Sequence, residues 1–319
     1  MSYVFSSHFK GFITEFISER RSLGFSYRSG RYRLAEFDRF CCEYFPDDTV
    51  LTRELVLQWL ELRSGEHVNN QSLRATYVRQ LGQYMQRTGT SAFIIPLGIT
   101  KKRIRYVPHV FTTSELQSFF SVVDQCNPSV FTPTRHLVAP ILFRLLYCCG
   151  LRPSEAAHLK AEDFDWEQGQ AFVRQSKGRK DRVVMLSNDV WALCQQYDDV
   201  ICERFPKRTW FFPNRLGKPF HPSTFDDWFH EFWDKAGISH VGGNSPRLYD
   251  LRHTFCVHRL NQWVKDGKDV QALLPYLSRY LGHVSISTTD YYLHLVPEFF
   301  PEWRLRANAG ETLIPEVSI

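Results

Sequence analysis

The stretch HLVAPILFRLLYCCGLRPSEAAHLK, residues 136–160, encodes a junction between two helices. Residues 136–149 are apolar on nearly every side of a helical projection, so they predict a helix that is buried all round. Gly150 suits the end of that helix because glycine readily adopts a left-handed backbone conformation, and Pro153 suits the first turn of the next helix. Arg152 is therefore expected between two helices, held in place by the core beneath it.

The sequence on either side of this junction predicts a mainly helical domain with one small sheet. Upstream, Thr112 and Glu115 form a capping-box pattern that begins a helix. Downstream, residues 163–187 have the pattern of three short strands, with turns at 167–169 and near Gly178. Helical periodicity returns at STFDDWFHEFWDKAG, LRHTFCVHRLNQWV, LPYLSRYLGH and TTDYYLHL. The predicted fold class is mainly α with a small antiparallel β-sheet (α+β).

Residues 1–105 are expected to form a separate helical domain that ends in a basic linker. Apolar side chains recur at helical spacing in residues 5–20, 32–44, 53–62 and 72–88, with turn-like sequences between them. The third of these stretches can start on a cap at Thr52. The segment PLGITKKRIRYVPHV, residues 96–110, has two prolines and a glycine that limit helix formation, so it reads as extended. Residues 106–319 then form the second domain, which ends in a loose tail.

The charge of the chain is modest but unevenly distributed. The net charge is +5, and residues 1–105 carry 16 Lys and Arg against 10 Asp and Glu. No acidic side chain lies between Glu66 and Glu115, whereas seven basic ones do: Arg74, Arg79, Arg87, Lys101, Lys102, Arg103 and Arg105. Such a stretch is a candidate surface for DNA phosphates, or else a solvated helix face followed by a basic linker.

Composition indicates an ordinary soluble protein of the cytoplasm. No apolar run approaches the ~20 residues that a membrane span needs, and the N-terminus lacks the apolar core of a signal peptide. Eight cysteines are present, and none forms a C-x-x-C pair. We therefore expect reduced thiols, no metal site and no cofactor.

Five residues in the second domain have the chemistry to break a phosphodiester without a metal: Arg152, Lys177, Arg252, His283 and Tyr292. Cations can neutralise the charge that grows on the non-bridging oxygens as phosphorus becomes five-coordinate. A tyrosine hydroxyl can supply the attacking oxygen. Each arginine could instead pair with a structural carboxylate, since Glu155 and Asp250 lie nearby in the sequence.

Three segments resemble the conserved boxes of the tyrosine recombinases of the phage-integrase type. GLRPSEAAHLKAEDF resembles the first arginine box, LYDLRHTF the second, and LGHVSISTTDYYLHL the box that holds the histidine and the nucleophile. The five residues follow one another at intervals of 25, 75, 31 and 9 residues, which are also similar to those of the family. The resemblance covers roughly residues 110–300. Residues 1–105 resemble the family's core-binding domain only in their helical periodicity and in their position before the second domain.

The resemblance implies a role for each residue. Arg152 and Arg252 would clamp the scissile phosphate, and His283 would donate a hydrogen bond to it. Tyr292 would attack to give a 3′-phosphotyrosyl bond, with its neighbour Tyr291 as a packing residue. Lys177, on the turn of a β-hairpin, would protonate the leaving 5′ oxygen. Lys180 on the same turn is its rival for that role, and Arg179 and Lys180 are expected to contact DNA.

One position departs from the family pattern. The residue three before the second arginine is usually a histidine that accepts the proton of the nucleophile, but here it is Tyr249. A phenol is a poor base at neutral pH. Tyr249 can still hydrogen-bond to the phosphate, while water or another group takes the proton, or the protein mainly binds DNA. His253 is expected to be only a structural neighbour of Arg252.

The resemblance implies double-stranded DNA as substrate and a homo-oligomer, expected to be a tetramer on paired sites, with an accessory recombinase or a DNA-bending protein as a further partner. Integration, excision, dimer resolution and transposition all use this chemistry, and the sequence does not choose among them. Two alternatives stay open at this point. A type IB topoisomerase uses nearly the same site to relax supercoils, and a non-catalytic accessory protein would only bind DNA.

Overall fold

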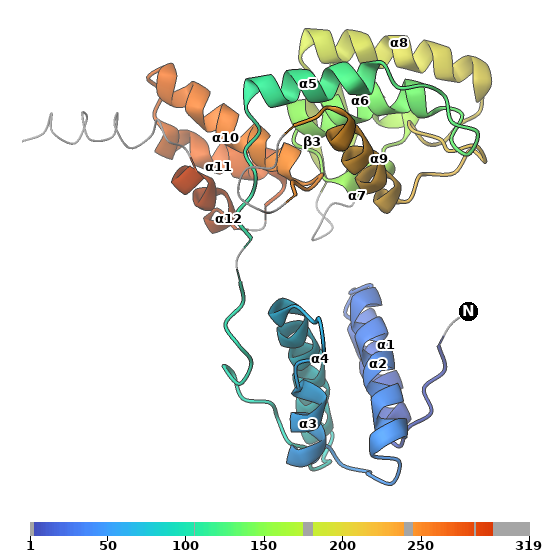
Figure 1. Cartoon of the computed structure of the whole chain (residues 1–319), viewed down its shortest axis with the longest axis vertical. Coiled ribbons are helices and arrows are strands. Elements are labelled where there is room, and N and C mark those ends of the chain that lie inside the picture. The colour runs from blue at the N-terminus through green and yellow to red at the C-terminus, as the bar shows by residue number, and fades with distance from the viewer. Residues whose placement is uncertain (1–2, 105, 175–180, 239–244, 284, 296–319) are drawn as a thin grey trace, which may run out of the picture. The chain divides into compact units, whose positions relative to one another are not determined.

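The computed structural model describes residues 3–295, except for 105, 175–180, 239–244 and 284. The chain divides into two compact units, Met1–Tyr106 and Val107–Ile319 (Figure 1). Among the described residues, no helix is both long enough and apolar enough to cross a membrane.

The N-terminal unit is built from helices α1 Lys10–Ser22, α2 Arg28–Tyr44, α3 Arg53–Leu60 and α4 Val68–Arg87. Helix α3 begins at the expected cap, because the Thr52 hydroxyl accepts a hydrogen bond from the backbone N–H of Leu55 at 3.2 Å. Helix α4 packs against the other three helices. Between them lies an apolar core in which Phe9, Phe37 and Leu81 are fully buried.

The second unit contains the remaining helices: α5 Thr113–Asp124, α6 Arg135–Cys148, α7 Pro153–Ala157, α8 Asn188–Arg204, α9 Pro222–Lys235, α10 Asp250–Lys265, α11 Val270–Leu281 and α12 Ser287–Asp290, with 3₁₀ turns η1 Ala161–Asp163 and η2 Tyr291–Leu295. The capping box at Thr112 and Glu115 is present. Helix α6 is the buried centre of the unit, and α5, α7, α8 and α10 pack against it. Helix α8 is an element that the sequence reasoning did not identify.

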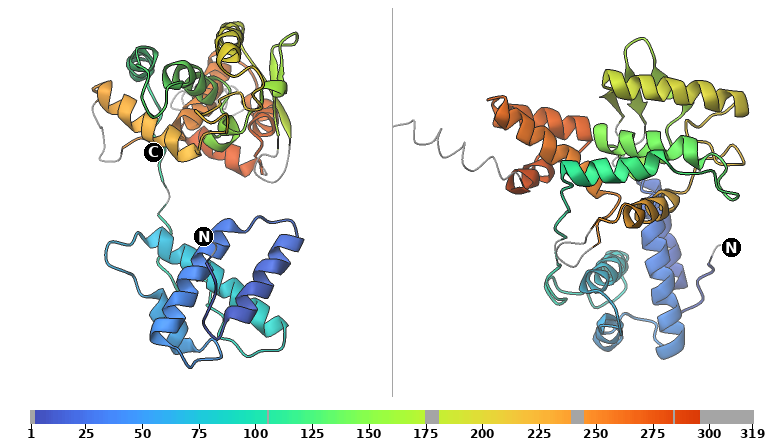
Figure 2. Two further views of the ribbon diagram at one scale, coloured as in Figure 1. Left: turned by 90° about the vertical axis from the view of Figure 1, so that its right-hand side faces the viewer. Right: turned by 45° about the horizontal axis from the view of Figure 1, so that its top comes forward.

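A three-stranded antiparallel sheet of order β1-β2-β3 completes the unit, with β1 Phe164–Asp165, β2 Gln170–Val173 and β3 Arg182–Met185. The register pairs Phe172 with Val183. Figure 2 shows the sheet at the edge of the unit rather than at its centre. The predicted fold class, mainly helical with a small antiparallel sheet, is confirmed.

Gly150 fixes the turn between α6 and α7. Its φ is +59°, a backbone conformation that residues other than glycine rarely adopt. A Cβ at this position would also lie 2.8 Å from the ring of Phe255 and 3.1 Å from Leu281. The turn can therefore approach α10 and α11 closely, and this approach brings Arg152 to the residues described next.

Candidate active site

Arg152 stands at the helix junction that the sequence predicts. It is the residue before α7, with Leu151 buried behind it. Its guanidinium donates to Glu155 Oε1 at 2.5 Å and to the carbonyl of Gly282 at 3.1 Å. Burial opposes the charged form, but the charge of Glu155 and a contact with Tyr249 prevail and raise the pKa of Arg152. Arg152 therefore stays cationic while linking the junction to the end of α11.

Arg252 lies in the first turn of α10 and is only 1 % exposed. Its guanidinium donates to the carbonyls of Gly150 at 2.5 Å and of Leu281 at 2.6 Å. Burial lowers its pKa, since a low-dielectric surrounding disfavours charge. These two bonds hold the turn after α6, the start of α10 and the end of α11 together, although the three segments are far apart in the sequence.

Glu155 is the carboxylate at the centre of this cluster. Besides the bond from Arg152, it accepts from Arg182 at 2.9 and 2.7 Å, and Arg252 lies 4.0 Å away. Three guanidinium groups around one buried carboxylate leave an excess of positive charge. Such an excess suits an anion like a phosphate. The ion pairs with Glu155 also set the directions in which the arginines point.

Tyr292 is buried, with 2 % of its surface exposed, and packs in the apolar cluster of α10 and α11. Its hydroxyl lies 2.8 Å from Nδ1 of His253. Burial raises the pKa of the phenol well above its ordinary value. The proposed nucleophile is thus protonated at rest and hydrogen-bonded to a residue that the sequence reasoning had treated as structural.

His283 follows Gly282, which ends α11 in the left-handed conformation with φ +66°. Its Nδ1 lies 2.7 Å from the hydroxyl of Thr289, and its ring stacks on Tyr292 with centroids 6.2 Å apart. Burial, and then the charge of Arg252, lower the pKa of His283 to about 3. The imidazole is therefore neutral at working pH and can donate a hydrogen bond through an N–H.

Tyr249 is the residue immediately before α10 and is partly exposed. Its ring lies 5.0 Å from that of His253, and the guanidinium of Arg252 lies 6.0 Å from its centroid. A side-chain hydrogen bond with Tyr249 is one of the contacts that raise the pKa of Arg152. Tyr249 thus lies among the candidate residues, beside the arginines and His253.

Four residues of the sequence prediction lie outside the described residues: Arg105, Lys177, Arg179 and Lys180. The described strands β2 and β3, which precede and follow residues 175–180 in the sequence, pair with each other. Within the described parts of the chain, no group of three or more His, Cys, Asp or Glu side chains could hold a metal ion.

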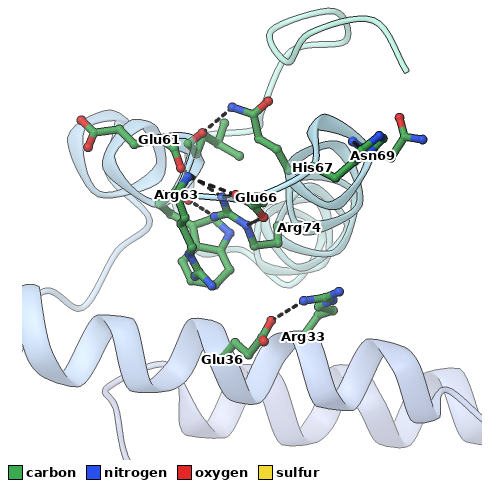
Figure 3. Close-up of polar contacts among 11 residues, drawn as sticks. Arg33, Glu36, Glu61, Arg63, Glu66, His67, Asn69 and Arg74 are labelled. Carbon is green, nitrogen blue, oxygen red and sulfur yellow. Dashed lines mark hydrogen bonds and ion pairs between the residues drawn. The ribbon is translucent and has the colours of Figure 1, made fainter. Parts of the chain in front are cut away.

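Arg74 is not at the surface, contrary to what its place in the basic stretch suggested. Figure 3 shows it surrounded by polar partners of α3 and the loop that follows. It is 0 % exposed, bonds Glu66 at 2.8 and 2.6 Å, and donates to the carbonyls of Trp59 and Glu61. A guanidinium that is buried and fully paired cannot reach a phosphate. We therefore correct its assignment from DNA contact to structural support.

The other cations of this stretch differ in how exposed they are, and so in whether they could contact a DNA phosphate. Arg79 donates to the carbonyls of Ile95 and Pro96, so it anchors the start of the linker. Arg87 is exposed and pairs with Glu19. The exposed cations of the described linker residues are Lys101, Lys102 and Arg103. These three, with Arg87, are the described cations of the unit's basic stretch that stand in solvent.

Three residues of the site were missed or undervalued by sequence reasoning. Glu155 appeared only as an alternative partner of arginine, Arg182 did not appear, and His253 was given a structural role. A signal existed for His253, because Tyr249 and His253 are four residues apart and so lie on one face of a helix. No comparable signal existed for Arg182, whose pairing with Glu155 depends on the placement of β3.

Comparison with known proteins identifies several relatives. Residues 109–298 match the model of the phage integrase family. A putative integrase/recombinase of Sinorhizobium fredii is 29% identical over 305 residues, covering 93% of this chain and 96% of that protein. A second one from the same organism is 30% identical over 285 residues, covering 88% and 90%.

Among solved structures, the Tn1549 transposon integrase in complex with circular intermediate DNA is similar, with a TM-score of 0.67 and 17% identity. The similarity covers 94% of this chain and 98% of that one. At this identity the likeness concerns the fold.

Proposed function

The chain belongs to the phage integrase family and is a tyrosine recombinase, and we propose that it cleaves and rejoins DNA through a 3′-phosphotyrosyl intermediate without metal or ATP. We further propose that it serves the integration, excision or transposition of a mobile element. One observation carries the mechanism. Arg152, Arg252, His283 and Tyr292 are spread over the second unit's sequence yet form one cluster joined by hydrogen bonds and ring contacts.

Arg152 and Arg252 would bind the non-bridging oxygens of the scissile phosphate. Arginine suits this task because its planar donor fork matches two phosphate oxygens. Each guanidinium already has a fixed direction, set by backbone carbonyls and by Glu155. A neutral His283 would donate to a remaining oxygen. Preorganised donors of this kind stabilise the charge that develops in the transition state.

Tyr292 would attack phosphorus while the 5′ oxygen leaves and takes a proton from Lys177. The phosphotyrosyl bond conserves the energy of the broken phosphodiester. A different 5′ hydroxyl can therefore reverse the step and exchange strands without ATP. Each strand exchange would need two cleaved sites, and we propose four protomers on two paired duplexes.

Double-stranded DNA is the proposed partner of both units. The solved neighbours include the lambda integrase bound to a core site and XerH bound to its difH substrate. In the N-terminal unit, the exposed cations Arg87, Lys101, Lys102 and Arg103 would contact phosphates. Contacts with phosphates position a protein on DNA but do not read its sequence. The target sequence is therefore left to other residues.

The test is covalent trapping on nicked duplex fragments drawn from the DNA flanking the gene. Cleavage near a nick releases a short strand and leaves the protein joined to DNA, which a denaturing gel resolves. We expect an adduct with the wild type and none with Tyr292→Phe, while both bind the fragment equally. An adduct that persists in Tyr292→Phe would place the nucleophile elsewhere, with Tyr291→Phe as the next variant. Absence of any adduct despite DNA binding would contradict the proposal.

A further inference from the structure

The attacking hydroxyl of Tyr292 needs a proton acceptor, because a neutral phenol is a weak nucleophile. The polar side chains around it come from three places. Tyr249 stands immediately before α10, helix α10 contributes His253 and Cys256, and the turn after α11 contributes His283. Arg252 on α10 supplies the nearest positive charge. The acceptor must come from this set or from solvent.

His253 has the geometry of an acceptor. Its Nδ1 is 2.8 Å from the Tyr292 hydroxyl, a normal distance for an O–H···N hydrogen bond. The phenol donates this bond when the imidazole carries its own proton on Nε2. His253 is only partly buried, so a proton that it gains can pass to solvent.

The other candidates are less suitable. Burial raises the pKa of the Cys256 thiol to about 12, so it is neutral and a weak acceptor. His283 stacks its ring on Tyr292 at an interplanar angle of 16°, and its Nδ1 faces Thr289 instead. Tyr249 packs on His253, and its hydroxyl is hydrogen-bonded to Arg152 rather than to Tyr292.

We propose that His253, and not Tyr249, accepts the proton of Tyr292 during cleavage. The Oη–P bond forms as the P–O5′ bond breaks, and the phenolic proton moves to Nδ1 of His253. In the rejoining step the 5′ hydroxyl gives its proton back to Lys177 as it attacks phosphorus. The Oη–P bond then breaks, and the imidazolium of His253 protonates the departing phenolate. This inference rests on the proposed function, because it names the base for the same reaction.

The charges around His253 make its basicity depend on substrate. Burial, and then the charge of Arg252, lower the pKa of His253 to about 4. The imidazole is therefore neutral in the free protein and can accept a proton. A DNA phosphate bound by Arg252 would offset that positive charge. Removing a nearby like charge makes the imidazole a stronger base. The base would thus gain strength when the phosphate to be cleaved is in place.

The test compares His253→Asn with His258→Asn in single-turnover trapping on the fragment that forms an adduct. Asparagine can keep a hydrogen-bond acceptor near the position of Nδ1, but it cannot take a proton. His258 is a matched control, because it lies on α10 like His253 and its Nδ1 also pairs with a tyrosine hydroxyl, that of Tyr147 on α6, at 3.0 Å. Tyr292→Phe runs alongside to identify the nucleophile.

We expect His253→Asn to slow cleavage by about 10²-fold or more at pH 7, within the usual range for loss of a general base. DNA affinity and melting temperature should match those of the wild type. The rate of the variant should rise by about tenfold per pH unit, because hydroxide replaces the base. The wild-type rate should be flat above the pKa of His253 and fall below it, because an imidazolium cannot accept a proton. Added imidazole should speed cleavage by His253→Ala.

Two results would overturn the assignment, and they are distinguishable. If His253→Asn cleaves as fast as the wild type or faster, with the same pH profile, the hydrogen bond only holds the nucleophile at rest. If His253→Asn does not fold, failure of imidazole to speed His253→Ala decides against the base. A wild type that forms no adduct at all would remove the proposed function, and with it this role.

Discussion

Arg74 in the N-terminal unit and Arg252 in the second unit are both fully buried, and each donates hydrogen bonds to two backbone carbonyls. They differ in the carboxylate beside them. Glu66 bonds Arg74 directly at 2.8 and 2.6 Å. Glu155 lies 4.0 Å from Arg252 and also pairs with two other arginines.

The difference lies in the balance of charge rather than in residue type or burial. Arg74 is neutralised by a carboxylate of its own, so it stabilises the loop after α3. Arg252 has only a share of a carboxylate, and its Nε has no hydrogen-bond partner among the described residues. A buried cation without full compensation is costly unless an anion joins it. The comparison therefore separates a structural arginine from one prepared for phosphate.

The largest effect should come from Arg252→Lys. A lysine keeps the charge but lacks the planar fork that serves two carbonyls and a phosphate oxygen. We expect covalent trapping to slow by about 10³-fold, the upper range for losing one donor to a developing oxyanion. DNA affinity, measured by fluorescence anisotropy, should fall less than tenfold. Equal losses in the two assays would mean that Arg252 only binds DNA.

Arg74→Met should act on stability and not on chemistry. It leaves the partly buried Glu66 without its cation. We expect a loss of about 3 kcal/mol, the lower end of the range for removing one member of a buried pair. The urea-induced unfolding of the full chain should show this loss. Adding Glu66→Gln should recover much of it, because both charges are then absent. If the double variant is no more stable than the single one, the stability lost in Arg74→Met comes from the hydrogen bonds to backbone carbonyls and not from the ion pair.

Acid should weaken the second unit specifically. Burial and the charge of Arg252 lower the pKa of His253 to about 4 and that of His283 to about 3. In the unfolded chain both titrate near 6.5, so the unfolded state binds more protons below that pH. Stability is therefore complete above about pH 6.5 and is lost as the pH falls toward the folded values. The loss at pH 5 is on the order of 2 kcal/mol for each histidine before the screening by solvent is discounted.

Urea unfolding followed at pH 7 and pH 5 checks this prediction. His253→Asn and His283→Asn together should flatten the dependence on pH. If the double variant keeps the full loss of stability at pH 5, the two histidines are not its source.

The smallest effect is expected from the linker. Replacing Lys101, Lys102 and Arg103 with alanine should weaken DNA binding and lower the slope of log K against log salt by about 0.9 for each phosphate that the variant no longer neutralises. Cleavage at saturating DNA should not change. Lys10→Ala is the control, since Lys10 is exposed in the same unit but lies outside the basic stretch. An unchanged salt slope in the triple variant would remove the linker from the interface.

Much of the molecule follows from local sequence. The caps at Thr52 and Thr112, the turn at Gly150 and the start of α7 at Pro153 depend on neighbours in the chain, and the structure has them as expected. Helix α8 was not identified in advance. Arg74 was misjudged because position in a basic stretch does not tell whether a side chain faces solvent or a carboxylate.

By itself, the sequence determined the family, the fold class and the residue types that can attack a phosphodiester, because these depend on short motifs and their order. Only the tertiary structure decided which charges are compensated and which groups meet. Glu66 neutralises Arg74, Glu155 is shared by three arginines, and His253 faces Tyr292. Most of these pairings join segments far apart in the chain, so they depend on how helices and strands pack, which no local pattern records.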